Sequence, residues 1–395
     1  MNGGGERDRL RDVAAAFRDR FRSDPTALVR APGRVNLIGE HTDYNDGFVL
    51  PMAIDREVRI ALRPRADRRV RVVALDLASD YLATDNGEEA EFSLAELERG
   101  HGWVEYLKGV AWSLAREGHV LHGFDGVVSG NVPRGAGLSS SAALELATAR
   151  AFYAVSRFEW EPDRIALACQ RAENEWLGVN TGIMDQLASA AGREGHALLI
   201  DCRTLITSAV PLPPDTTVLV LDTTTRRGLV GSAYNERREQ CESAARTLGA
   251  RSLRDVSQEQ FDAASAALNP LLRRRARHVV SENARTLAAA AAMREGDAAL
   301  LGELMDQSHK SLRDDFEVST SELDKIVACA RSQPGCYGAR LTGAGFGGCA
   351  VALVSASAAP AIAAGVLDCY RTDTGLEARA YLCRPSSGTG EVNQQ

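Results

Sequence analysis

Residues 33–47, with the sequence GRVNLIGEHTDYNDG, carry an unusual density of hydrogen-bonding side chains. They include an arginine, a glutamate, a histidine and two aspartates, with few apolar residues among them. Side chains of these types form directional hydrogen bonds as donors or as acceptors. The segment therefore offers a fixed set of polar groups that a plain turn does not need.

A second segment, residues 132–147 (VPRGAGLSSSAALELA), places glycines and three serines between an expected strand and an expected helix. Such a loop presents backbone N–H groups at a helix N-terminus, where the helix dipole favours an anion such as phosphate. Considered alone, it also fits an ordinary connection, because serine is a common N-cap and glycine a common turn residue. No Gly-Lys-Ser/Thr follows, so the segment is not a P-loop.

A third segment, residues 342–348 (TGAGFGG), allows close approach of the backbone because glycine has no Cβ. A hairpin turn is the simpler interpretation of this segment by itself. Glu173 and Asp185 lie in expected helices, where helix capping or an exposed face would explain either carboxylate. His119 and His122 are three residues apart but have no nearby carboxylate, and we interpret both as surface residues rather than metal ligands.

The elements around these segments follow from the spacing of apolar residues. An amphipathic helix is expected before residue 22. The strands expected in the first half of the chain cover 26–32, 48–54, 57–64, 68–76, 124–130 and 196–202, and the helices cover 103–117, 140–155, 161–178 and 184–192. The second half is predicted to contain a strand over 216–225, then mostly helices, a strand–glycine–strand unit over 339–354, a strand over 376–385 and a loose tail over 386–395.

A chain of 395 residues is long enough for two domains. The adjacent prolines in residues 211–214 (PLPP) mark the best boundary, so we expect domains over 1–210 and 211–395. The composition, 45% hydrophobic and 25% charged, is that of a globular protein.

Charge and composition exclude several classes of partner. A net charge of −7 argues against nucleic-acid binding, and we interpret the basic run 272–278 (LRRRARH) as a helical face in solvent. No apolar stretch reaches the roughly 18 residues of a membrane span. The eight cysteines include no CxxC pair, which predicts neither a disulfide framework nor a zinc site and favours the cytoplasm. With only three lysines, phosphate chemistry must depend on arginine, backbone amides or metal.

Taken in order, the three segments resemble the three motifs of the GHMP kinases, and residues 33–44 (GRVNLIGEHTDY) resemble the galactokinase signature. The similarity continues through GIMDQ, HALLIDCR, YNERREQCE, RHVVSENAR and LRDDFE, so that it covers nearly the whole chain. It implies an α+β, two-lobed fold, with a mixed β-sheet plus helices in each lobe and the active site between the lobes. The implied reaction is transfer of the γ-phosphoryl group of ATP to the C1 hydroxyl of galactose, with Mg²⁺ as the cofactor.

The resemblance also implies a role for each matching residue. Arg34 and Asp185 flank the reacting C1 oxygen, and Asp185 is expected to stay ionised, to orient the hydroxyl and to receive its proton late as the catalytic base. The implied sugar contacts are Glu40, His41, Thr42, Asp43 and Tyr234. The triphosphate is expected over Gly135, Ala136, Gly137, Leu138, Ser139, Ser140 and Ser141, and Mg²⁺ at Ser141 and Glu173.

A sugar explains the polar density of residues 33–47, because almost all of its surface is hydroxyl. An epimer that turns one hydroxyl away leaves a buried carboxylate unpaired, so glucose is predicted to be a poor substrate. One alternative is an N-acetylgalactosamine-1-kinase with a larger pocket at C2. Another is a non-catalytic sensor of galactose and ATP, although Ser141, Arg34, Glu173 and Asp185 are all intact. We expect a cytoplasmic monomer, with weak homo-oligomerisation as the alternative.

Overall fold

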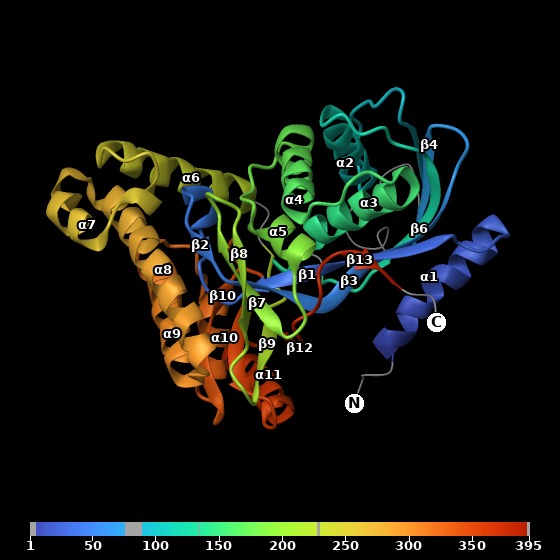
Figure 1. Ribbon diagram of the computed structural model, residues 1–395. Coiled ribbons are helices and arrows are strands. Elements are labelled where there is room, and N and C mark those ends of the chain that lie inside the picture. The colour runs from blue at the N-terminus through green and yellow to red at the C-terminus, as the bar shows by residue number, and fades with distance from the viewer. Residues whose placement is uncertain (1–4, 76–88, 134, 227–229, 393–395) are drawn as a thin grey trace.

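The computed structural model describes residues 5–75, 89–133, 135–226 and 230–392, and these residues form an α+β fold (Figure 1). A six-stranded sheet has the order β13-β1-β3-β6-β4-β5. Its strands are β1 (Ala27–Asn36), β3 (Pro51–Pro64), β4 (Arg69–Ala74), β5 (Glu89–Ser93), β6 (Phe124–Gly130) and β13 (Gly390–Glu391). The β4–β6 pair is parallel and the other pairs are antiparallel, so this sheet is mixed, as predicted.

Helices cover both faces of this sheet. The helices of this part of the chain are α1 (Gly5–Phe21), α2 (Val104–Arg116), α3 (Ser140–Ser156), α4 (Pro162–Arg171) and α5 (Met184–Ala191). Phe17 of α1 packs with Ala61 of β3 on one face, whereas Ile60 and Leu62 belong to the main core on the other face. Burial on both faces explains why β3 lacks the alternation of exposed residues that is typical of a half-buried strand.

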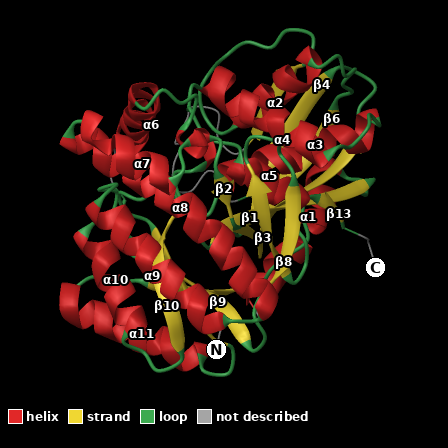
Figure 2. Ribbon diagram, turned by 60° about the vertical axis from the view of Figure 1, so that its left-hand side comes forward, coloured by secondary structure: helices red, strands yellow, loops and turns green. Residues whose placement is uncertain are grey.

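The second half of the chain builds a four-stranded sheet of order β10-β11-β9-β12, in which the pairs are antiparallel. Its strands are β9 (Thr216–Asp222), β10 (Cys336–Thr342), β11 (Cys349–Ser355) and β12 (Arg379–Cys383). The helices here are α6 (Val230–Thr247), α7 (Gln258–Ala264), α8 (Pro270–Glu295), α9 (Ala298–Asp314), α10 (Ser321–Arg331) and α11 (Ala359–Thr374). The long helices α8 and α9 lie side by side (Figure 2).

A small third sheet has the order β2-β7-β8. It contains β2 (Phe48–Val49), β7 (His196–Asp201) and β8 (Thr207–Pro211). The chain leaves it at Pro211 and enters the four-stranded sheet at Thr216, so it changes sheet across the PLPP segment. The main apolar core nevertheless includes residues from both halves, such as Val35 and Val218.

Several expected elements differ in the structure. Residues expected as strands 48–54 and 57–64 form the short β2 and one long strand, β3, because pairing with β1 continues through Ala53 and Val58. The expected loose tail 386–395 instead contributes β13, which pairs with the edge of β1 at Val29 and Arg30. Without β13, that edge of β1 would be left exposed. Residues 393–395 lie outside the described part of the chain.

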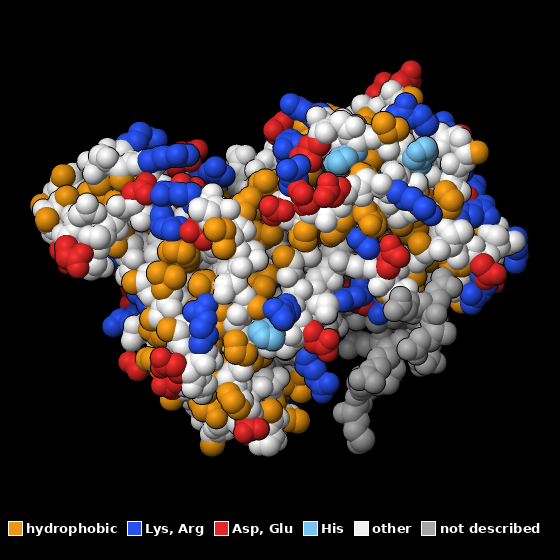
Figure 3. Space-filling model, viewed as in Figure 1, with side chains coloured by type: hydrophobic (Ala, Val, Ile, Leu, Met, Phe, Trp, Pro, Cys, Tyr) orange, Lys and Arg blue, Asp and Glu red, His pale blue; other side chains and the backbone are white. Residues whose placement is uncertain are grey.

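Two expectations drawn from composition also need correction. The basic run 272–278 is not a wholly solvent-facing surface, since Arg275 and His278 in α8 are almost fully buried. Cys329 of α10 and Cys369 of α11 form a disulfide, although the spacing of the cysteines predicted none; they lie 40 residues apart and meet only because these helices pack together. On the face drawn in Figure 3, basic and acidic side chains are interspersed. None of the helices that the structure describes is long and apolar enough to cross a membrane.

Candidate active site

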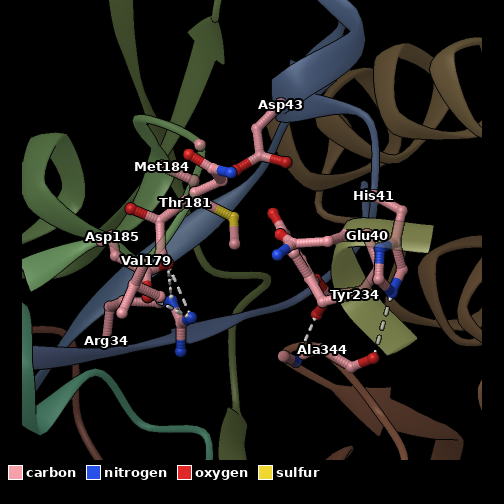
Figure 4. A pocket seen from close by; sticks show the side chains of 15 residues that line it. Arg34, Glu40, His41, Asp43, Val179, Thr181, Met184, Asp185, Tyr234 and Ala344 are labelled. Atoms are coloured by element: carbon pink, nitrogen blue, oxygen red, sulfur yellow. Dashed lines mark hydrogen bonds and ion pairs between the residues drawn. The ribbon is translucent and has the colours of Figure 1, made fainter. Parts of the chain in front are cut away.

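Two cavities meet at one arginine–aspartate pair. The first, of about 480 Å³, is lined by most of the predicted sugar residues, and the second, of about 510 Å³, by the serine-rich segment. Arg34, Asp185 and Ala344 line both cavities. In Figure 4, Arg34 and Asp185 lie on one side of the first cavity, with Glu40 and His41 across from them. The arrangement allows a molecule in one cavity to react with a molecule in the other.

Arg34 and Asp185 form a bidentate ion pair. The Arg34 Nε donates to Asp185 Oδ1 at 2.8 Å, and Nη2 donates to Oδ2 at 2.7 Å. The Ser139 hydroxyl also donates to Asp185, and Arg34 Nη1 donates to the Gly137 carbonyl oxygen. Because Arg34 comes from β1 and Asp185 from the first turn of α5, these bonds join three separate segments at the point where the cavities meet.

Glu40 is a buried carboxylate at the wall of the first cavity. Its Oε1 accepts a hydrogen bond from the Gly343 N–H at 2.7 Å and from the Thr342 hydroxyl at 3.3 Å. Arg340 Nη1 lies 3.5 Å from the same oxygen. Burial raises the pKa of Glu40 above its ordinary value, while Arg340, Arg34 and the hydrogen bond from the Gly343 N–H oppose the rise. The third glycine-rich segment therefore supports the sugar signature directly.

Asp43 lines the same cavity from a short 3-10 turn, Asp43–Asn45. Burial and the nearby Asp185 raise the pKa of Asp43 to about 7. Gly182 packs against this side chain so closely that a Cβ at position 182 would lie 1.7 Å from Asp43 Oδ2. A glycine is therefore required at position 182 for Asp43 to keep this position.

His41 and Tyr234 also line the first cavity, with ring centroids 5.7 Å apart. Both ring nitrogens of His41 have protein partners, the Tyr44 hydroxyl at 2.9 Å and the Ala344 carbonyl oxygen at 3.1 Å. Burial lowers the pKa of His41 to about 3, so the ring is neutral. Thr42 does not line the cavity: it is fully buried, and its hydroxyl donates to the carbonyl oxygens of Gly39 and Phe48. The geometry thus gives Thr42 a role in shaping the turn and does not support the predicted contact with sugar.

The serine-rich segment leads into α3 and lines the second cavity. The predicted residues that line it are Gly135, Gly137, Leu138, Ser139, Ser140 and Ser141. Ala136 is the exception: it is fully buried and does not line the cavity. Gly135, Gly137 and Ser139 all have positive φ, and the first two are glycines that adopt this conformation without strain. The segment approaches the third motif, since a Cβ at Gly343 would lie 3.2 Å from the Gly137 carbonyl oxygen.

Glu173 lies just behind this segment, in a π-helical turn at Ala172–Leu177. Its carboxylate accepts hydrogen bonds from Ser141, from Thr181 at 2.9 Å and from Gln186 at 2.7 Å. Burial and Asp185 raise the pKa of Glu173, and those hydrogen bonds oppose the rise. A hydroxyl and a carboxylate in contact are hard oxygen donors, and this pair fits Mg²⁺. The expected single helix over 161–178 missed the π turn, a feature that often occurs at functional sites.

Several residues around the cavities were not singled out from the sequence. Trp103, at the N-cap of α2, and Tyr106, in its first turn, line the second cavity beside apolar residues, and their spacing of three was the available signal. Glu145 of α3 is fully buried near Glu173, and Gln186 donates to both carboxylates. Glu145 lies in a strongly helix-forming run of the sequence, and this position gave no signal of the contact with Gln186.

Comparisons with known proteins identify the family of the chain. The galactokinase galactose-binding signature matches residues 15–64, the GHMP kinases N terminal domain matches 105–193, and the GHMP kinases C terminal domain matches 289–372. A galactokinase from Roseiflexus sp. (strain RS-1) is 50% identical over 387 residues, which cover 96% of this chain and 97% of the relative.

Solved structures extend the comparison. A crystal structure of Lactococcus lactis galactokinase complexed with galactose is 35% identical, with a TM-score of 0.91 over 97% of this chain and 100% of that chain. Methanococcus jannaschii mevalonate kinase, at 19% identity and a TM-score of 0.64, covers 93% of this chain and 100% of its own, and shows a shared fold only. With half of its residues identical to a galactokinase along almost its whole length, this chain belongs to the galactokinase family of the GHMP kinases.

Proposed function

We propose that this chain is a galactokinase that transfers the γ-phosphoryl group of ATP to the C1 hydroxyl of galactose. The observation that carries the proposal is the pair of cavities that share Arg34 and Asp185. One cavity is walled by carboxylates, which suit a ring of hydroxyl groups. The other is lined by a glycine- and serine-rich helix N-terminus, which suits phosphate.

In this proposal galactose lies in the first cavity with its C1 hydroxyl at Asp185. Glu40 and Asp43 accept hydrogen bonds from other sugar hydroxyls, and Tyr234 lies against the sugar. The C1 oxygen forms a bond to the γ-phosphorus as the bond from phosphorus to the bridging oxygen of ADP breaks. Asp185 orients the hydroxyl and accepts its proton late in the step, because a loose transition state does not need an early alkoxide.

The triphosphate is assigned to the second cavity, along residues 135–141. Backbone N–H groups at the start of α3 and the guanidinium of Arg34 would offset its charge. Ser141 and Glu173 would hold Mg²⁺, which supplies further charge neutralisation at the phosphates when bound. We assign the adenine base to the apolar end of the cavity, at Trp103 and Tyr106. None of these groups is a lysine, so the proposal agrees with the small number of lysines in the chain.

An ADP-release assay with MgATP tests the function against galactose, N-acetylgalactosamine, glucose, homoserine and mevalonate in parallel. We expect fast turnover with galactose and poor turnover with glucose. Faster turnover with N-acetylgalactosamine would change the substrate but keep the chemistry. No turnover with any of them, while galactose still raises the melting temperature, would replace the kinase by a sensor.

Four further properties of the chain are proposed. We propose a boundary between lobes at residues 211–214, where the chain changes sheet. The monomeric state and the cytoplasmic location stay predictions, as does the absence of a nucleic-acid partner. Size-exclusion chromatography with light scattering measures the oligomeric state.

A further inference from the structure

The turn that carries Glu40 is held from behind by a helix of the other half of the chain. The backbone N–H groups of Gly39 and Glu40 point at Glu282 of α8, whose Oε1 lies 3.1 Å and 3.4 Å from the two nitrogens. Gly39 has a φ of +95°, and a Cβ there would lie 2.7 Å from the Phe48 carbonyl oxygen. The turn is thus packed tightly and its N–H groups depend on one carboxylate.

Glu282 is fully buried and does not line the sugar cavity. Its Oε1 also accepts from the Ser308 hydroxyl at 2.6 Å, and its Oε2 accepts from Arg285 Nε at 2.8 Å. Burial alone would disfavour the charge, but Arg285, His278 and Arg340 outweigh burial and lower the pKa of Glu282 to about 2. The turn is therefore anchored to a fixed negative charge.

Other residues on the same face of α8 hold the turn at further points. His278 Nε2 donates to the Glu40 carbonyl oxygen at 3.1 Å, and Asn283 Oδ1 accepts from the Phe48 N–H at 2.9 Å. His278 and Glu282 are four residues apart, so the helix presents both to the turn. Each of these contacts joins residues more than 230 positions apart in the chain.

We propose that Glu282 is a positioning residue for sugar recognition, which fixes the Glu40 carboxylate by accepting the backbone N–H groups of Gly39 and Glu40. The inference rests on the proposed function, in which Glu40 accepts a hydrogen bond from the sugar. A displacement of about 1 Å in such a group weakens recognition strongly, because the hydrogen bond is directional. Epimer discrimination then depends on a residue that never touches the sugar.

The test replaces the carboxylate by its amide in Glu282→Gln. An amide has one acceptor oxygen, so either the N–H groups of the turn or Arg285 must face an NH₂ group. We expect the KM and the calorimetric Kd for galactose to rise about tenfold, the KM for ATP to change by less than about twofold, and the preference for galactose over glucose to fall. A purely structural role would lower the melting temperature without this split between the substrates.

Asp125→Asn is the matched control, because Asp125 is also buried and paired with arginines but lies in β6, outside both cavities. It should lower the melting temperature and leave the KM for galactose unchanged. The inference would be overturned if Glu282→Gln bound galactose as tightly as the wild type does. It would also be overturned if the KM values for galactose and ATP rose equally. Failure of the wild type to bind galactose would instead refute the proposed function.

A second variant covers the case in which Glu282→Gln does not fold. Ser308→Ala removes one donor to Oε1 and leaves the carboxylate in place. We expect a smaller rise in the KM for galactose, of about threefold, with the KM for ATP unchanged. No change in the KM for galactose in a folded Ser308→Ala protein would then overturn the inference.

Discussion

In the proposed function, the two cavities, called here the sugar cavity and the phosphate cavity, recognise their ligands by different physical means. The sugar cavity uses two carboxylates, the buried Glu40 and the half-buried Asp43, on a turn that is anchored by the second half of the chain. The phosphate cavity uses a short glycine- and serine-rich loop at the start of α3. A buried carboxylate is costly unless it is paired, and it therefore discriminates strongly between ligands that do and do not pair with it. Backbone N–H groups at a helix end bind any suitably placed phosphate.

Because of this difference, we expect the sugar cavity to discriminate strongly between sugars. We expect the phosphate cavity to discriminate little between phosphate ligands. The difference also predicts that substitutions in one cavity leave binding in the other unchanged. Arg34, Asp185 and Ala344 are the exceptions, since they line both cavities.

The largest effect is expected where the cavities meet. Asp185→Ala removes the group that is proposed to orient the C1 hydroxyl, and we expect kcat to fall at least about a thousandfold. The Arg34 Nη1 bond to Gly137 remains, so the fold should persist, which circular dichroism and a thermal melt would verify. A folded variant with a near-normal kcat would remove Asp185 from the mechanism.

On the sugar side, Glu40→Gln removes a charged acceptor while keeping its shape. We expect kcat/KM for galactose to fall about a hundredfold, with the KM for ATP nearly constant. Steady-state kinetics with each substrate varied in turn measures both values. Equal losses for galactose and ATP would contradict independent recognition in the two cavities.

A smaller effect is expected from pH, because the pKa of Asp43 is raised to about 7. A raised carboxyl pKa means that the ionised acceptor is lost as pH falls through 7, so kcat/KM for galactose should fall about tenfold per pH unit in that range. His41, with a pKa of about 3, stays neutral there and adds no step. Asp43→Asn should lower kcat/KM and flatten the profile, whereas an unchanged pH step in that variant would assign the step to another group.

The smallest effect is expected on the phosphate side, where many groups share the charge. Ser141→Ala removes one neutral hydroxyl that contacts Glu173, and we expect the Mg²⁺ requirement and the KM for ATP to rise about fivefold. The KM for galactose should stay constant. Titration of activity with Mg²⁺ at fixed ATP measures the shift, and a change confined to galactose would reverse the assignment of the two cavities.

Features that depend on one continuous segment were predicted from the sequence, whereas features that depend on contacts between distant segments were not. Residues 33–47 and 132–147 are continuous segments. Their turns and side chains act within the segment itself, so the sequence pattern was enough to predict a functional role. The roles of Glu282 and Arg340 depend on contacts between β10, α8 and a turn over 240 residues earlier. Helical spacing and composition carry no information on such contacts. Thr42 was assigned to the sugar because it lies in the signature, yet its hydroxyl is used within the turn.

The same reasoning applies to the fold. The strand β6 and the helices α2 and α3 have strong local patterns and were predicted within one or two residues. The strand β13 and the Cys329–Cys369 disulfide were missed, because each depends on a partner segment far away in the chain. The π turn around Glu173 arises inside a helical pattern and has no sequence signal of its own.

The central claim is that the hydroxyl at the Arg34–Asp185 pair is the C1 hydroxyl of galactose. Incubation of the protein with MgATP and galactose labelled with ¹³C at C1, followed by ³¹P NMR of the product, tests it directly. We predict a phosphomonoester signal that is split by coupling to the labelled carbon. A phosphorylated sugar without that coupling would contradict the claim, because the phosphoryl group would then be on a different hydroxyl.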